Sequence, residues 1–134
     1  MGTEVHSSLQ EMCDRVLDRC SDIWAIIIST GDGVPIVKAV SPNLREGLLI
    51  SELETSMARY FSLAVDHASK MSLGALRAST TFYKSLVLVH INLQPLVVTC
   101  VHDVNSNIGT TLDIIPELAE ALEPIRVQVD TLYK

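Results

Sequence analysis

The sequence predicts an α+β domain with the element order α-β-β-α-β-β-β-α, in which helices cover both faces of a five-stranded antiparallel sheet. Two apolar runs flank the turn Gly31-Asp32-Gly33, which is the strongest short-range signal of a β-hairpin. Three further strand-like runs follow one another at short spacing, and three segments repeat apolar residues at helical spacing. Because short connections join antiparallel neighbours, the five strands are expected to form one sheet.

Length and composition favour one folded domain spanning residues 1–134, with residues 1–7 expected to be flexible. Apolar residues make up 48% of the chain, which argues against disorder. The net charge of -6 leaves no basic surface for nucleic acid or anionic lipid. The odd number of cysteines indicates reduced, cytosolic thiols. We found no secretory signal and no apolar run long enough to cross a membrane, so any membrane contact is expected to be indirect.

The first helix is predicted to begin at Ser8, because Ser8 and Glu11 match the capping-box pattern. Its apolar residues then fall at helical spacing: Leu9, Met12, Cys13, Val16, Leu17 and Cys20. The hairpin from Ile23 to Ala39 follows. Its first strand is apolar at nearly every position, which predicts an inner strand with helices above and below.

A polar connection from Ser41 to Gly47 leads to the longest periodic segment, a helix expected from Leu49 to Met71. One broad apolar stripe of this helix is expected to pack on the sheet: Ile50, Leu53, Met57, Tyr60, Phe61, Ala64, Ala68 and Met71. Beside the stripe runs a flank of small residues: Ala58, Ser62, Val65 and Ser69. This flank is either a partly solvated edge or the docking face for a second helix.

The next three strands are predicted from Arg77 to Tyr83, Leu86 to Ile91 and Leu96 to Val101. The last two are almost wholly apolar and are expected to be central. The first carries three hydroxyl residues in its middle, which predicts an edge strand. An exposed edge without an internal proline or lysine is a template for pairing with another chain.

A final helical pattern begins at Ser106 and contains Pro116 and Pro124. A proline inside a helix removes a hydrogen bond and costs about 3 kcal/mol. We therefore expect a kink or a break near Pro116.

The search for chemistry gives no catalytic or cofactor site. A strand, rather than a helix, follows Gly31-Asp32-Gly33, so this segment is a hairpin turn and not a phosphate loop. His90, Cys100 and His102 lie on adjacent predicted strands and could form a metal site or a Cys-His nucleophile pair. Alternation places Cys100 and His102 on one face, yet no fourth metal ligand or orienting third group accompanies them. We expect no metal, no cofactor and no enzyme activity.

Four motifs, in this order, resemble the MEK partner 1 family of roadblock-fold MAP kinase scaffolds in the Ragulator complex. They are DGVPIVK at Asp32–Lys38, LAVDHASKMSLG at Leu63–Gly74, PLVV at Pro95–Val98, and Asn107-Ile108-Gly109. The resemblance extends from about Val16 to about Val129. The chain departs from the family in a longer N-terminal segment, in extra residues after Val40 and in the two prolines of its last helix.

The resemblance implies a roadblock/longin-like fold and a non-catalytic adaptor that forms a heterodimer with a second roadblock protein. It implies that other Ragulator subunits, MEK and ERK kinases and Rag GTPases of mTOR signalling are partners. The expected location is the cytosolic face of late endosomes and lysosomes, reached through a separate lipidated subunit. The alternative is a roadblock subunit that serves dynein or another small-GTPase regulator.

In that family the long helices and the edge strands of the two partners pair. The expected dimer interface here comprises Ala58, Phe61, Ser62, Val65, Ser69, Ala78, Ser79, Thr80, Thr81 and Phe82.

Overall fold

The computed structural model describes residues 2–41, 58–71, 77–82, 86–103, 105 and 109–132. The elements in chain order are α1 (Gly2–Arg19), β1 (Ile23–Thr30), β2 (Pro35–Val40), α3 (Ala58–Lys70), β3 (Ala78–Phe82), β4 (Leu86–Leu93), β5 (Leu96–Asp103) and α4 (Gly109–Leu132). The predicted α+β class and element order are confirmed. The expected connection from residue 42 to 47 and the first part of the expected long helix, residues 49–57, lie outside the described residues.

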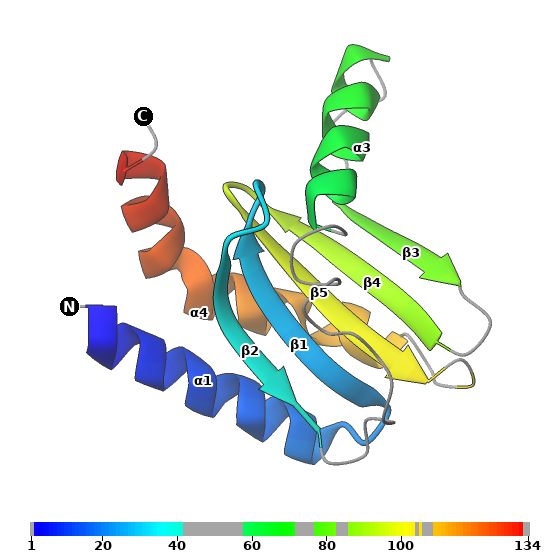
Figure 1. Ribbon diagram of the computed structural model, residues 1–134. Coiled ribbons are helices and arrows are strands. Elements are labelled where there is room, and N and C mark those ends of the chain that lie inside the picture. Colours follow the sequence, from blue (N-terminus) through cyan, green and yellow to red (C-terminus); the bar gives the residue numbers. More distant parts are fainter. Residues whose placement is uncertain are drawn as a thin grey trace.

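The five strands form one antiparallel sheet in the order β2-β1-β5-β4-β3 (Figure 1). Every residue of β1 is buried, as its apolar sequence predicted, and β4 and β5 are the other inner strands. The hairpin turn between β1 and β2 is also confirmed. Gly33 has a φ of 92°, in the left-handed region that glycine adopts without strain. The turn therefore needs glycine at this position.

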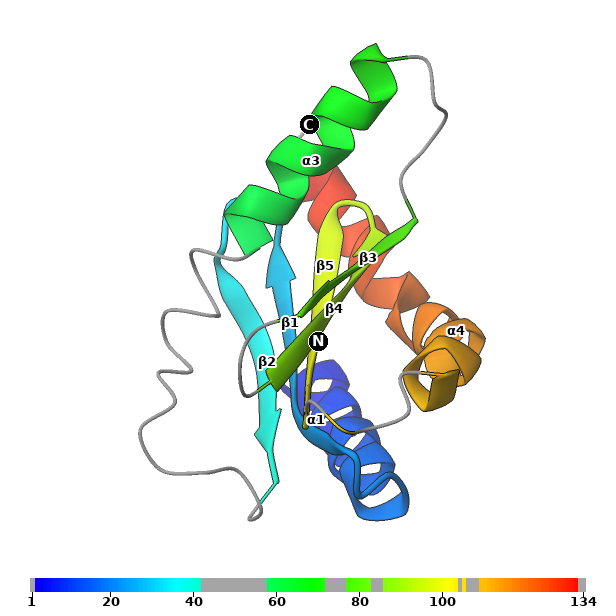
Figure 2. The ribbon, with the colours of Figure 1, turned by 90° about the vertical axis from the view of Figure 1, so that its right-hand side faces the viewer.

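Helices α1 and α4 cover one face of the sheet, and α3 lies on the opposite side against β4 and β5 (Figures 1 and 2). The main core lies between the sheet and helices α1 and α4. Its largest fully buried side chains include Val16, Ile26, Ile28, Leu118 and Leu122. A second cluster occupies the other face of the sheet: Trp24, Ala25, Ile27, Leu86, Leu88 and Val101. The sheet therefore has apolar residues on both faces, as predicted.

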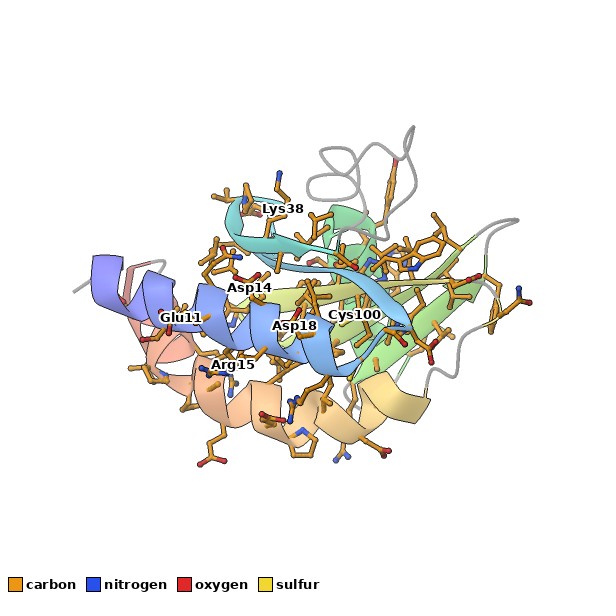
Figure 3. All side chains as sticks on the ribbon, turned by 90° about the horizontal axis from the view of Figure 1, so that it is seen from below. Glu11, Asp14, Arg15, Asp18, Lys38 and Cys100 are labelled. Carbon is orange, nitrogen blue, oxygen red and sulfur yellow. The ribbon has the colours of Figure 1, made fainter. Side chains whose placement is uncertain are left out.

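Helix α1 begins at Gly2, so the predicted start at Ser8 is wrong. No proline or glycine separates Thr3 from Ser8, and the serine and glutamate of a capping-box pattern are also tolerated inside a helix. Residues 2–7, for which we expected flexibility, form the first turns of this helix. The predicted apolar face is buried, whereas the charged side is exposed to solvent (Figure 3): Glu11, Asp14, Arg15 and Asp18.

Of the kink or break expected near Pro116, the break is wrong, because helix α4 is continuous from Gly109 to Leu132. Pro116 and Pro124 both lie inside it, and the helix bends along its length (Figure 1). Each proline removes one backbone hydrogen bond, but burial of Leu118, Leu122 and Ile125 against the core holds the helix together. Arg19 of α1 forms an exposed ion pair with Glu117 of α4 at 3.2 Å, which contributes at most about 1 kcal/mol.

Candidate interaction surface

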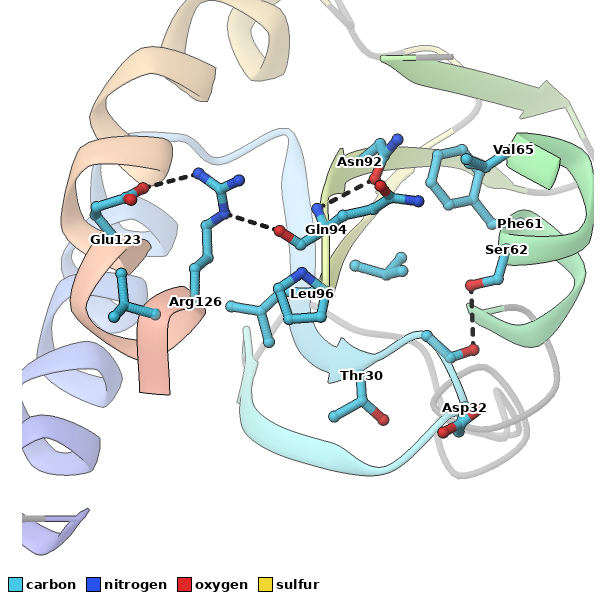
Figure 4. Close-up of a pocket in the computed structure, with 14 residues that line it drawn as sticks. Thr30, Asp32, Phe61, Ser62, Val65, Asn92, Gln94, Leu96, Glu123 and Arg126 are labelled. Atoms are coloured by element: carbon cyan, nitrogen blue, oxygen red, sulfur yellow. Dashed lines mark hydrogen bonds and ion pairs between the residues drawn. The ribbon is translucent and has the colours of Figure 1, made fainter. Parts of the chain in front are cut away.

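Among the described residues, a hydrogen bond and a small apolar cluster attach helix α3 to the sheet. Ser62 Oγ donates a hydrogen bond to the carbonyl oxygen of Gly31, in the hairpin turn, at 3.1 Å (Figure 4). Phe61 is buried against Val97, and its ring stacks on that of His90 with the centroids 5.3 Å apart. Val65 packs against the same cluster. The side of α3 that carries residues 61, 62 and 65 therefore faces the chain's own sheet.

Part of the apolar stripe of α3 that was expected to pack on the sheet is instead exposed to solvent. Tyr60 is 63% exposed and Met71 is 66% exposed, and Ala64 is also exposed, so the prediction is wrong for these three residues. At 100° per residue they lie within about 40° of one another, whereas Phe61 and Val65 lie about a third of a turn away. The apolar surface of α3 is wide enough for two contacts, and the sequence pattern does not decide which half meets the sheet.

We define the α3 outer stripe as Tyr60, Leu63, Ala64, His67 and Met71, all of which are exposed. Leu63, at 55% exposure, and His67 were missed as candidate site residues. The signal was present, because both share the helical spacing of Tyr60 and Met71. A row of large apolar side chains on the outside of a helix marks an interaction site.

Strand β3 is an edge of the sheet, as predicted. It pairs with β4 from Ala78 opposite Ile91 to Phe82 opposite Val87, and no described strand lies on its other side. Thr80, Thr81 and Phe82 are exposed, the last to 68%. An edge strand presents backbone N–H and C=O groups that can pair with another chain. The edge therefore offers backbone hydrogen bonds in addition to the apolar stripe.

The remaining expected interface residues occupy different environments. Ser62, Val65, Ala78 and Ser79 are half-buried, and Phe61 is buried beneath the helix. Ala58 and Ser69 lie on α3, but their side chains are outside the described part of the structure. Membership of a dimer interface stays a prediction for all the expected residues.

The candidate metal or nucleophile residues are not brought together. Cys100 lies opposite Val89 and His102 lies opposite Val87, so these two share a sheet face, as predicted. His90 lies opposite Thr99 and is therefore on the other face. Within the described ranges, no group of three or more acidic, histidine or cysteine side chains could hold a metal ion.

Burial also removes the reactivity that such groups would need. It lowers the pKa of His90 to about 4 and raises the pKa of Cys100 to about 12, so at neutral pH both side chains are uncharged. A neutral thiol without a base beside it is a poor nucleophile.

In the described parts of the chain, no helix is both long and apolar enough to span a membrane.

A family model and relatives of known name match most of the chain. A family model described as "Mitogen-activated protein kinase kinase 1 interacting" matches residues 7–129. The chain is similar to the Ragulator complex protein LAMTOR3 of Xenopus tropicalis, with 29% identity over 91% of this chain and 95% of that protein. The LAMTOR3 protein of Bos taurus is 30% identical over the same shares.

Solved structures show the fold alone. The gliding protein MglB of Thermus thermophilus matches with a TM-score of 0.75 and 12% identity, covering 95% of this chain and 92% of that chain. A Roadblock/LC7 domain from Streptomyces avermitilis matches with a TM-score of 0.72 and 10% identity, covering 87% of this chain and 95% of that chain. The expected roadblock-type fold is confirmed.

Proposed function

Because the chain belongs to the family of proteins described as mitogen-activated protein kinase kinase 1 interacting, we propose that it is a non-catalytic scaffold that forms a heterodimer with a second roadblock protein. The exposed α3 outer stripe, together with an open β3 edge, is the observation that carries this proposal. Helix α3 contacts β4 and β5, and β3 is the edge strand that follows β4 in the sheet (Figure 1). One partner could cover both.

The two features supply different parts of an interface. Tyr60, Leu63 and Met71 would lose water on pairing, which stabilises a complex by about 25 cal/mol per Å² of buried apolar surface. The β3 edge would add backbone hydrogen bonds by strand addition, which fixes register and orientation. Obligate interfaces commonly bury roughly 2,000 Å² or more, so a partner that covers the helix face and the strand edge together fits this class better than one that covers either alone.

The curated relatives support a more specific role. They are named Ragulator complex proteins, and the chain covers 95% of their length. We infer that this protein is a Ragulator subunit that helps to recruit MEK and ERK kinases and the Rag GTPases of mTOR signalling. Its place would be the cytosolic face of late endosomes and lysosomes, with attachment through a lipidated subunit.

Affinity purification of the tagged full chain from cell extract, followed by mass spectrometry, tests this role. We expect one roadblock protein in equal molar amount, together with the other Ragulator subunits. A leucine-to-arginine variant at Leu63 is the matched control, because it should lose the roadblock protein. Dynein chains in place of Ragulator subunits would support the alternative roadblock function, and recovery of the chain alone would contradict both.

A further inference from the structure

A cleft of about 640 Å³ opens at the end of the sheet where four segments meet (Figure 4). The β1–β2 turn and α3 form one side, the β4–β5 turn forms the middle, and the second half of α4 forms the other side. The cleft is separate from the α3 outer stripe and from the exposed end of β3. Its volume is within the usual range for sites that bind a small ligand or a few residues of a peptide.

The walls of the cleft are mostly apolar. Phe61 and Val65 contribute from α3, Leu96 and Val97 from β5, and Val127 from α4. Val127 is 59% exposed, although it borders a concave surface. Binding of a ligand that covers these aliphatic side chains would be favourable, because it removes apolar surface from water.

Most of the polar groups that line the cleft are already paired. Arg126 donates from Nε to the carbonyl oxygen of Gln94 at 3.1 Å and forms an ion pair with Glu123 at 2.7 Å (Figure 4). Ser62 is bound to Gly31. Asp32, in the β1–β2 turn, is exposed and has no basic partner among the described residues. Counted over the described residues, the uncompensated charge of the cleft is therefore negative.

We propose that this cleft binds an extended segment of a protein partner, and that the segment places one lysine or arginine side chain in it. The aliphatic stem would lie on Val97 and Val127, and the cationic end would reach Asp32. Long basic side chains combine an apolar stem with a charged head, which matches these walls and this rim. A small polar metabolite fits less well, because such ligands are oriented by several convergent polar groups, and here those groups are paired.

The inference rests on the proposed scaffold function and adds a second contact surface to it. A scaffold must hold a client while its dimer interface is occupied. Asp32 and Val127, which would contact the client, meet this need because they belong neither to the α3 outer stripe nor to β3, although Phe61, Ser62 and Val65 of the expected dimer interface also line the cleft. The two surfaces can therefore be altered independently.

A library of short immobilised peptides, with a fixed central residue and random flanking residues, tests the proposal with the full-length chain. We expect lysine or arginine at the centre to bind about fivefold more protein than glutamate, the ratio that a weak surface ion pair gives. Asp32→Asn should remove this preference while keeping the turn, since Asn-Gly and Asp-Gly favour the same hairpin. Val127→Glu should weaken binding of apolar flanks, and the exposed Glu120→Gln on α4 is the matched control.

Selection of acidic residues would overturn the proposal, because Arg126 would then be the recognising group. A uniform signal across the library, or a basic preference that survives Asp32→Asn, would overturn it as well. If Val127→Glu lowered the molar mass of the isolated chain in light scattering, the cleft would hold a second copy instead. Heterodimer formation is measured separately, so a failed library with an intact heterodimer removes this inference alone.

Discussion

The Ser62 hydroxyl lies so close to Gly31 that a side chain on the glycine would collide with it. A Cβ atom at residue 31 would be 3.0 Å from Ser62 Oγ, the same oxygen that donates a hydrogen bond to the Gly31 carbonyl. The bond joins α3 to the hairpin turn. Together with the buried Phe61, it holds one face of α3 on the sheet and leaves the outer stripe exposed.

This relationship predicts a specific coupling between the two positions. Ser62→Ala removes the hydrogen bond and should lower the free energy of unfolding by about 1 kcal/mol. Gly31→Ala should lower it by a similar amount, about 1 kcal/mol, because the hydroxyl must move. In the double variant the clash is absent, so the second change should cost less than it does alone. Urea unfolding of the four proteins measures this, and strict additivity would contradict the contact.

The stability of the fold should depend on pH through His90. Burial lowers its pKa from 6.5 to about 4, so between these values the unfolded chain binds a proton that the folded chain does not. The free energy of unfolding should therefore be highest above pH 6.5 and fall as the pH is lowered toward 4, by up to about 3 kcal/mol.

Chemical unfolding of wild type and His90→Phe at a series of pH values measures the contribution of this group. Phenylalanine can keep the stack on Phe61 and cannot titrate, so its pH dependence should be shallower. The exposed His67→Gln is the control and should follow the wild type. Equal slopes for His90→Phe and wild type would show that His90 does not carry the effect.

The α3 outer stripe should be essential for pairing but not for folding. Leu63→Arg places a charge within the stripe, and it should weaken binding of the roadblock partner by about 2 kcal/mol or more, roughly thirtyfold. The side chain is already largely exposed, so circular dichroism should stay unchanged. Glu120→Arg, at an exposed residue of α4 on the other face of the sheet, should pair normally in a pull-down. Loss of pairing in both variants, or in neither, would place the interface elsewhere.

Pairing of a partner strand with the β3 edge can be tested at two neighbouring residues. Consecutive N–H groups of a strand point to opposite sides, so Thr80→Pro and Thr81→Pro remove donors that face different neighbours. One variant should disturb the ladder with β4 and lower the melting temperature. The other should leave the melting temperature nearly unchanged and abolish pairing. If both variants still paired, strand addition at this edge would be excluded.

The parts of the fold that depend on local chemistry were predictable. The hairpin follows from its Asp-Gly turn, and the inner and edge strands follow from how apolar they are. The predicted start of α1 at Ser8 was wrong, because a capping-box pattern does not stop a helix from beginning earlier when the preceding residues also favour helix. The break at Pro116 was wrong because the core on both sides of it holds α4 together.

The site was harder to predict than the fold. The sequence identified the right helix and the right strand, but it placed Tyr60 and Met71 against the sheet and left Ser62 and Val65 for the partner. The rotation of α3 depends on contacts between distant segments, which are the Ser62–Gly31 bond across 31 residues and the packing of Phe61 on Val97 and His90. The cleft depends on four distant segments and has no sequence motif.

Light scattering of the purified full chain, alone and with the roadblock protein recovered from cells, tests the central claim most directly. The account predicts that the chain alone self-associates or precipitates at micromolar concentration, and that the mixture forms a stable complex with one copy of each protein. A monodisperse monomer of 14.7 kDa that does not change when the partner is added would contradict it.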